Sequence, residues 1–200
     1  MQFQDLTPGT DIEAGSRVVS ETEIVEFASR HDPQWLHVDR DRAERGRWKG
    51  LTSALRGAIF GSIEELAATS SVKALVICGS GRGFSAGADI RDLSAAFREP
   101  TLPQLVGLIE SWTIPVIAAL HGPFLGGGLE LALGAHYRIA DATASLGLPE
   151  IKLGLIPGAG GTQRLPRLIG LKAALDMIST GEPVDAHRAV ELWSWDWSTN

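Results

Sequence analysis

Residues 126–134 read GGGLELALG, and this stretch decides the fold that the rest of the sequence supports. Three glycines lead into apolar residues at helical spacing, which predicts a helix over residues 130–140 that contains one acid, Glu130. Just before the glycines, residues 115–120 read PVIAAL, a short apolar run typical of a strand buried on both faces. A strand, a glycine turn and a helix in this order indicate one βα unit of a parallel sheet.

The same alternation of strand and helix continues on both sides of this unit. Residues 72–78, VKALVIC, predict a second buried strand, and the glycine-rich residues 79–89 predict the loop that follows it. Helices are expected where apolar residues recur every three or four positions, at 55–66, 90–97, 102–112, 171–180 and 186–193. Residues 151–166 are rich in glycine and proline and predict loops and turns. The pattern is that of an α/β fold.

The composition excludes several classes of function. Of the 200 residues, 44% are hydrophobic and 21% are charged, which is ordinary for a globular domain that can build a core. The formal net charge of -6 provides no broad basic field for a nucleic acid. No apolar run reaches the ~18 residues of a membrane span, and the N-terminus does not resemble a signal peptide. A single cysteine cannot form an internal disulfide, which fits a reducing compartment. The sequence thus predicts a cytoplasmic protein, with an organelle as the alternative location.

Two isolated acids are the candidate catalytic residues. Glu130 falls in the first turn of its predicted helix, where the helix dipole favours the ionised form. Glu150 stands among apolar residues in LGLPEIKLG, where Pro149 predicts a loop tip. Two carboxylates at one apolar site can divide the roles of acid and base, because different surroundings separate their pKa values. The usual alternative for either residue is a solvated surface glutamate.

The glycine turns offer backbone donors and a rival motif. N–H groups at a helix start have no intrahelical partner, and glycine lets a ligand approach them closely, so residues 126–128 can stabilise an oxyanion. Close packing of the strand on the helix is the more usual explanation of such glycines. Residues 83–87, GFSAG, match the nucleophile elbow of hydrolases, with Ser85 as nucleophile and His121 or His136 as base. Against this reading, several glycines separate the serine from the preceding strand.

No motif for a cofactor or a metal ion is complete. GSGRGF has Phe84 where a dinucleotide-binding loop has its third glycine, and GAGGTQR, at residues 158–164, lacks the lysine of a phosphate loop. No group of His, Cys, Asp or Glu residues has the spacing of metal ligands. The sequence therefore predicts neither a bound cofactor nor a metal.

Four stretches of the chain occur together in one known family: FSAGADIRDL, IPVIAALHGPFLGGGLELALG, LGLPEIKLGLIPGAGGTQRLPRLIG and AALDMISTG. The family that they resemble is the crotonase superfamily, that is, the enoyl-CoA hydratase/isomerase family. The similarity covers about residues 53–190 and is greatest to the hydratase part of bifunctional fatty-acid oxidation enzymes. It implies a crotonase-like ββα core and, as function, hydration of a trans-2-enoyl-CoA in fatty-acid β-oxidation, with isomerisation of an enoyl-CoA as the alternative.

The resemblance also implies roles for individual residues. Glu130 and Glu150 match the two catalytic glutamates, and the N–H groups of Ala88 and Gly127 would form the oxyanion hole for the thioester carbonyl. The loop beside the CoA moiety would contain Ala86, Gly87, Asp89 and Ile90. The CoA thioester is the substrate in this chemistry, so no cofactor is implied. Family members form trimers, which implies a homo-oligomer.

Residues 1–50 differ in character from residues 51–200, and we expect them to form a separate part. They resemble the start of a MaoC-like hot-dog dehydratase, in which an aspartate and a histidine five residues apart perform the hydration; Asp32 and His37 match that pair. Because the sequence has no further strands of that fold, we expect the pair to be vestigial and inactive.

The second part, residues 51–200, lacks the strand pair that opens a crotonase domain and the helices that close it. We therefore expect a core that is incomplete at both ends. A non-catalytic protein that binds acyl-CoA is the corresponding alternative function.

Overall fold

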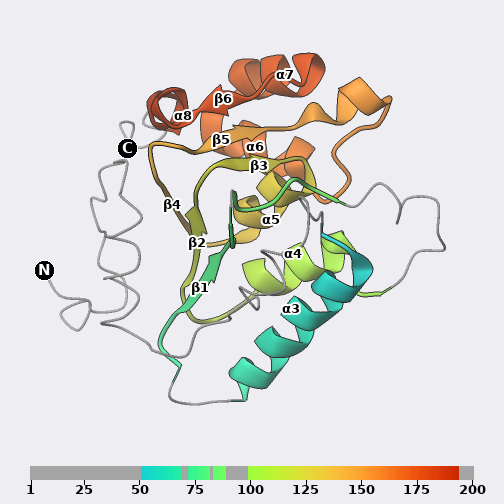
Figure 1. Ribbon diagram of the computed structural model, residues 1–200, viewed down its shortest axis with the longest axis vertical. Coiled ribbons are helices and arrows are strands. Elements are labelled where there is room, and N and C mark those ends of the chain that lie inside the picture. The colour runs from blue at the N-terminus through green and yellow to red at the C-terminus, as the bar shows by residue number, and fades with distance from the viewer. Residues whose placement is uncertain (1–50, 69–71, 82, 89–98, 194–200) are drawn as a thin grey trace, which may run out of the picture.

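The computed structural model describes residues 51–68, 72–81, 83–88 and 99–193 (Figure 1). Asp32, His37 and the whole hot-dog-like segment lie outside the described residues, as does the helix predicted over residues 90–97. The division of the chain at residue 50 therefore stays a prediction.

Three parallel strands form the first sheet, in the order β1–β2–β4: Leu75–Cys78, Val116–Leu120 and Tyr137–Ala140. Leu75 is paired with Val116, and Ile117 is paired with Tyr137. All residues of β2 are buried, as expected for a central strand that is covered on both faces. Helices connect the strands, which confirms the predicted parallel βα arrangement.

A second and smaller sheet has the order β3–β5–β6: Pro123–Leu125, Ser145–Gly147 and Val184–Asp185. Strand β3 is parallel to β5, and β6 is antiparallel to β5. The chain thus passes from the first sheet to the second just before the three glycines. The sequence analysis missed these strands, because two or three residues are too few to show any periodicity.

Three helices lie side by side along the first sheet (Figure 1): α3, α4 and α5, at Ser53–Ala67, Leu102–Glu110 and Gly127–Gly134. Helix α4 packs against both α3 and α5. The side chains of Ile63, Leu105 and Ile109 are completely buried between these helices and the sheet. Because α5 lies innermost, every one of its residues is buried.

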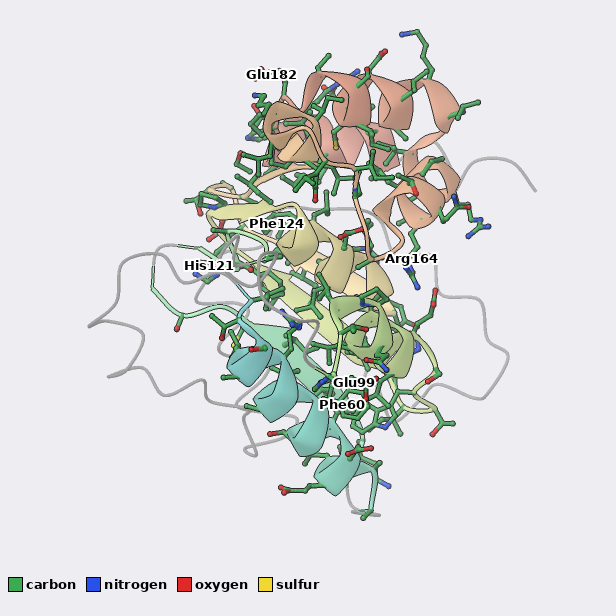
Figure 2. All side chains as sticks on the ribbon, turned by 90° about the vertical axis from the view of Figure 1, so that its right-hand side faces the viewer. Phe60, Glu99, His121, Phe124, Arg164 and Glu182 are labelled. Carbon is green, nitrogen blue, oxygen red and sulfur yellow. The ribbon has the colours of Figure 1, made fainter. Side chains whose placement is uncertain are left out.

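The rest of the chain forms η3, α6, α7 and α8, at Pro149–Leu153, Gly161–Ile169, Leu171–Thr180 and Ala186–Trp193. Helices α7 and α8 lie at the end of the molecule opposite α3, as the two views at right angles show (Figure 1, Figure 2). Helix α6 packs against both α5 and α7, and η3 packs against α7. The predicted ends are confirmed here: Gly181, with φ 65°, ends α7, and Asp185 Oδ1 accepts the Arg188 N–H at 2.8 Å at the start of α8.

The helix predicted over residues 130–140 is wrong in its second half. Helix α5 ends at Gly134, Ala135 is extended with ψ 150°, and β4 follows. The Arg138 guanidinium donates to the carbonyls of Ala132 and Ala135 at 3.2 and 2.6 Å, which satisfies the end of the helix. Apolar residues continue across this boundary, so their spacing alone does not reveal it.

The loop predicted over residues 151–166 is also partly wrong. Helix α6 begins at Gly161 and contains Pro166, a residue that disfavours helices. Burial of Leu165 and Ile169 in the core outweighs that preference. Glu150 lies in the 3-10 helix η3 and not at an irregular loop tip.

Candidate active site

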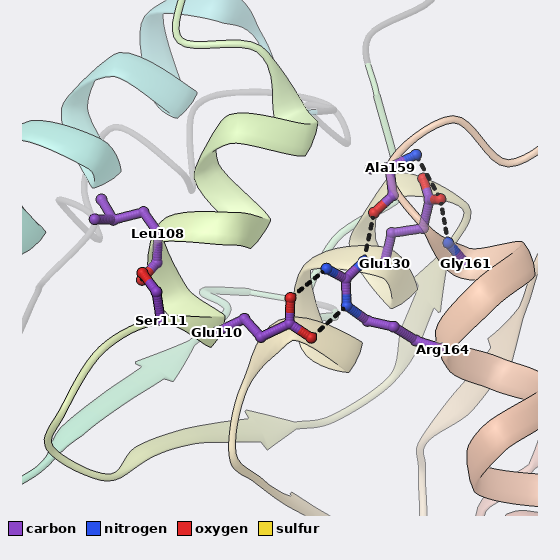
Figure 3. Close-up of polar contacts among 7 residues, drawn as sticks. All are labelled: Leu108, Glu110, Ser111, Glu130, Ala159, Gly161 and Arg164. Carbon is purple, nitrogen blue, oxygen red and sulfur yellow. Dashed lines mark hydrogen bonds and ion pairs between the residues drawn. The ribbon is translucent and has the colours of Figure 1, made fainter.

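Glu130 lies in the first turn of α5, as predicted, and it is not a surface residue. Only 2% of it is exposed. Its Oε1 accepts two main-chain hydrogen bonds, from the Ala159 N–H at 2.7 Å and from the Gly161 N–H at 2.8 Å (Figure 3). Hydrogen bonds to an ionised acceptor are among the strong ones, so these two donors fix the position of the carboxylate.

Glu150 reaches the same place from η3. A Cβ on Gly126, the residue that precedes α5, would lie 2.9 Å from Glu150 Oε1, and a Cβ on Gly161 would lie 3.0 Å from Glu130 Oε1. These two glycines therefore leave the space that the carboxylates occupy. Glu150 Oε2 is buried, and no group in the described part of the chain forms a hydrogen bond with it. Both acids thus lie near the start of α5, close enough for the charge of Glu130 to act on Glu150.

The surroundings of the two acids differ in their electrostatics. Burial raises the pKa of Glu130, while the Gly161 and Ala159 N–H groups and the charge of Arg164 oppose that rise. Burial also raises the pKa of Glu150; its own N–H opposes the rise, and the negative charge of Glu130 adds to it. Glu130 is held by two main-chain donors from residues 159–161, whereas Glu150 Oε2 has no partner among the described residues and is exposed to the charge of Glu130. Glu130 is therefore the better anion and Glu150 the better proton donor.

The main-chain amides of Ala88 and Gly127 lie close together beside these acids. A Cβ on Gly127 would lie 3.1 Å from the Ala88 nitrogen, and a Cβ on Gly87 would lie 3.4 Å from the Gly127 nitrogen. Gly127 is the first residue of α5, so its N–H has no partner within the helix. Two adjacent donors at the positive end of a helix can stabilise a negatively charged oxygen.

Two of the four residues predicted to lie near CoA are described. Ala86 is exposed, and Gly87 is buried with φ 98°, a conformation that favours glycine. The Gly87 carbonyl accepts the Leu51 N–H at 2.7 Å, which ties this loop to the start of α3. Asp89 and Ile90 lie outside the described residues, so the role of the loop stays a prediction.

The serine-hydrolase alternative does not fit the geometry. Ser85 Oγ accepts the Gly87 N–H at 3.2 Å. His136 Nδ1 accepts a main-chain N–H at 3.0 Å, and His121 Nε2 lies 3.3 Å from the Gly81 carbonyl oxygen. A serine nucleophile requires a base within hydrogen-bond reach, and in the described ranges neither histidine is hydrogen-bonded to Ser85.

The sequence analysis missed the two donors to Glu130, Ala159 and Gly161. From the sequence, the GAGG pattern at residues 158–161 indicates only an incomplete phosphate loop. Main-chain N–H groups have no residue type of their own, so the small side chains were the one available signal. A main chain approaches a carboxylate closely only where its side chains are small.

Two further kinds of functional feature are absent from the described residues. None of the helices there is long and apolar enough to cross a membrane. Within the same ranges, no three or more His, Cys, Asp or Glu side chains are placed to hold a metal ion. Burial raises the pKa of the Cys78 thiol, which keeps that side chain in its less reactive form.

The fold and the paired carboxylates define a class of protein. The chain belongs to the enoyl-CoA hydratase/isomerase family, whose model matches residues 49–192. It is 52% identical over 142 residues to the peroxisomal bifunctional enzyme of Danio rerio, covering 71% of this chain and 20% of that protein. It is 47% identical over 140 residues to the fatty acid oxidation complex subunit alpha of Shewanella frigidimarina (strain NCIMB 400), covering 65% of this chain and 20% of that one.

A solved structure supports the same conclusion. The enoyl-CoA hydratase from Bacillus anthracis aligns with a TM-score of 0.65 at 38% identity, covering 70% of this chain and 57% of that chain. The family resemblance and the crotonase-like α/β fold predicted from the sequence are thus confirmed. The chain spans a fifth of the length of the two longer relatives, so what those proteins do is not thereby assigned to it.

Proposed function

We propose that this chain is an enoyl-CoA hydratase, which adds water across the double bond of a trans-2-enoyl-CoA during fatty-acid oxidation. The observation that carries the proposal is the position of Glu130 and Glu150 near the start of α5, together with the adjacent amides of Ala88 and Gly127. Names of the relatives in its family, which include a hydratase and a fatty acid oxidation subunit, support the same chemistry.

The two glutamates divide the proton transfers between them. Glu130, whose Oε1 is held by two N–H groups, acts as the base and takes a proton from water as the water oxygen bonds to C3 of the substrate. The electron pair of the double bond moves toward the thioester, and Glu150 delivers its proton to C2. The net reaction is the addition of one water molecule. Proton exchange with solvent then returns Glu130 to its ionised form and Glu150 to its protonated form.

Negative charge gathers on the thioester oxygen while the C3–O bond forms. The N–H groups of Ala88 and Gly127 would meet that oxygen, and the N-terminus of α5 adds a favourable dipole. Removal of one such donor typically raises the barrier by about 3 kcal/mol. Small residues at both positions let the thioester approach the main chain.

The remaining parts of the proposal concern ligands and assembly. Addition of water transfers no electrons to or from the substrate, so the chemistry requires no redox cofactor. Residues 86–90 are the proposed contact with the CoA moiety. A homo-oligomer and a cytoplasmic location stay predictions from the sequence; the name of the Danio rerio relative describes that protein as peroxisomal.

The proposal is tested by Glu150→Gln in a hydratase assay that follows the loss of enoyl-thioester absorbance. Because the variant cannot donate the proton to C2, we expect turnover to fall by about 10²–10⁴-fold. The matched control is Glu182→Gln, which removes an exposed carboxylate that pairs with Lys152 of the same η3 helix at 2.8 Å. The control should retain the activity of the unmodified chain.

Unchanged turnover by Glu150→Gln would refute the proposal that the chain is a hydratase with Glu150 as its proton donor. If the unmodified chain instead shifts the double bond of a 3-enoyl-CoA without adding water, it is an isomerase. If it binds acyl-CoA and converts neither substrate, the non-catalytic alternative holds.

A further inference from the structure

A row of polar contacts leads from α4 to the Glu130 carboxylate (Figure 3). The Arg164 guanidinium, on α6, donates to both carboxylate oxygens of Glu110 at the end of α4: Nε to Oε1 at 3.1 Å and Nη2 to Oε2 at 2.6 Å. Its remaining terminal nitrogen, Nη1, donates to the Ala159 carbonyl at 2.9 Å. One guanidinium therefore joins the end of α4 to the segment that precedes α6.

The residue that Arg164 holds is the residue that binds Glu130. Ala159 offers its carbonyl to Arg164 and its N–H to Glu130 Oε1. Gly160, with φ 95°, packs directly under the guanidinium, because a Cβ at that position would collide with Arg164 Nη1. The next N–H, that of Gly161, is the second donor to Glu130. The segment 158–161 is thus fixed from one side by Arg164 and contacts the carboxylate from the other.

We propose that Arg164 and Glu110 are positioning residues for Glu130: they hold segment 158–161 so that the N–H groups of Ala159 and Gly161 keep Glu130 Oε1 in place. This inference rests on the proposed function, in which Glu130 takes a proton from water. Neither Arg164 nor Glu110 needs to touch the substrate. Their effect passes through the main chain and through the charge of Arg164.

The two residues contribute unequally. A bidentate arginine–carboxylate pair fixes the plane of the guanidinium as well as its place. The Glu110 side chain is 56% exposed and that of Arg164 is 19% exposed. A surface pocket of about 350 Å³ between α4 and α6 is lined by both side chains and by Ala159 and Gly160, so solvent reaches the pair. We therefore expect a large effect from Arg164 and a small, salt-sensitive effect from Glu110.

The charged groups around Glu130 fix the sign of the expected pH effect. Glu150 faces it from η3, Arg164 from α6, and Arg138 of β4 lies at the other end of α5. Glu110 lies on the far side of Arg164, and its own pKa is lowered chiefly by its hydrogen bonds with Arg164 and further by the charges of Arg164, Arg167 and His136. The charge of Arg164 and the N–H groups that Arg164 aligns both lower the pKa of Glu130 against the effect of burial. Loss of Arg164 should therefore raise that pKa and move the acid limb of the activity profile to higher pH.

The experiment compares Arg164→Met, Arg164→Lys and Glu110→Gln in the full chain, with Lys172→Met as control. Lys172 forms an exposed pair with Asp176 on α7, at 3.0 Å. For Arg164→Met we expect kcat to fall about tenfold with KM within about twofold, and the acid limb of kcat to move up by about half a pH unit. In Arg164→Lys the acid limb should lie between those of Arg164→Met and the unmodified chain, because lysine keeps the positive charge but cannot form the bidentate hydrogen bonds.

Glu110→Gln should lower kcat about threefold at low ionic strength, and this loss should vanish in high salt. The double variant Glu110→Gln/Arg164→Met should equal Arg164→Met alone, because Glu110 acts through Arg164. Lys172→Met should match the unmodified chain. The inference would be overturned if the acid limb of kcat stayed in place in Arg164→Met and unfolding of the variant accounted for its loss of kcat.

A second measurement separates this inference from the proposed function. The ionisation of Glu130 is followed by NMR of ¹³C-labelled glutamate carboxyls, assigned by comparison with Glu130→Gln. If the unmodified chain hydrates nothing, the proposed function fails, and the NMR titration still decides: a raised midpoint for Glu130 in Arg164→Met supports the positioning role, and an unchanged midpoint refutes it.

Discussion

The two proposed catalytic acids lie in regions of opposite character. Glu130 belongs to α5, where every residue is buried, and its Oε1 accepts two main-chain hydrogen bonds. Glu150 belongs to η3, which contains no buried residue, and Leu153 of that helix is 62% exposed. Glu130 is therefore part of the core, and Glu150 approaches the core from its rim, by which we mean the exposed helix η3.

The comparison teaches that the fold, and not the residue type, separates acid from base. Both side chains are glutamates, and burial raises the pKa of both. Glu130 has two main-chain donors from residues 159–161 that stabilise its negative charge, and that charge disfavours ionisation of Glu150. The surroundings of two identical residues thus favour ionisation of Glu130 over that of Glu150, which is the difference that a base and an acid need.

The largest expected effect comes from removal of each carboxylate by substitution with alanine. Glu130→Ala leaves the N–H groups of Ala159 and Gly161 without their acceptor, so the free energy of unfolding should fall by about 3 kcal/mol. Glu150→Ala removes a side chain whose Oε2 has no partner in the described residues, so its stability should change little. Urea unfolding of both variants measures the difference.

Glu130→Gln is the control for this pair of variants. The amide oxygen of glutamine still accepts both N–H groups, so stability should remain near that of the unmodified chain while turnover is lost. Equal destabilisation by Glu130→Ala and Glu150→Ala would show that the main-chain donors do not distinguish the two regions.

The same contrast explains how much could be predicted from the sequence. Strand β2 has an apolar run of sufficient length, and there pattern and burial agree. The apolar spacing of α7 predicted its helix as well, although Leu171 and Leu175 are exposed. Strand β4 follows α5 without a polar break, and its pairing with β2 depends on partners that are distant along the chain. Local periodicity contains no information about such pairing.

For the site, Glu130 and Glu150 stood out because each is a lone acid among apolar neighbours. The sequence could not show that they meet, since Gly126 and Gly161 make room for them only in three dimensions. Nor could it show the donors, because main-chain N–H groups are present at almost every residue. The family resemblance supplied the pairing that the residues alone left open.

The dependence of stability on pH offers a smaller effect. The pKa of Glu150 is raised in the folded chain, so as pH rises above the ordinary value of 4.5 the folded state retains a proton that the unfolded state releases. Stability should therefore fall as pH rises through the folded pKa. Glu150→Gln removes this contribution, so its stability relative to the unmodified chain should be higher at pH 7 than at pH 4. Thermal unfolding across this range provides the measurement, and a gain that is the same at both pH values would contradict it.

The smallest expected effect concerns the rim itself. Leu153 projects from η3 with most of its surface in solvent. Leu153→Ala therefore hardly changes the apolar area that folding buries. We expect the free energy of unfolding to change by less than about 0.5 kcal/mol, in line with other exposed positions. Urea unfolding at two protein concentrations tests this. A larger loss that grows with concentration would show that another copy covers this side of η3, and the description of Glu150 as a residue on an open rim would then be wrong.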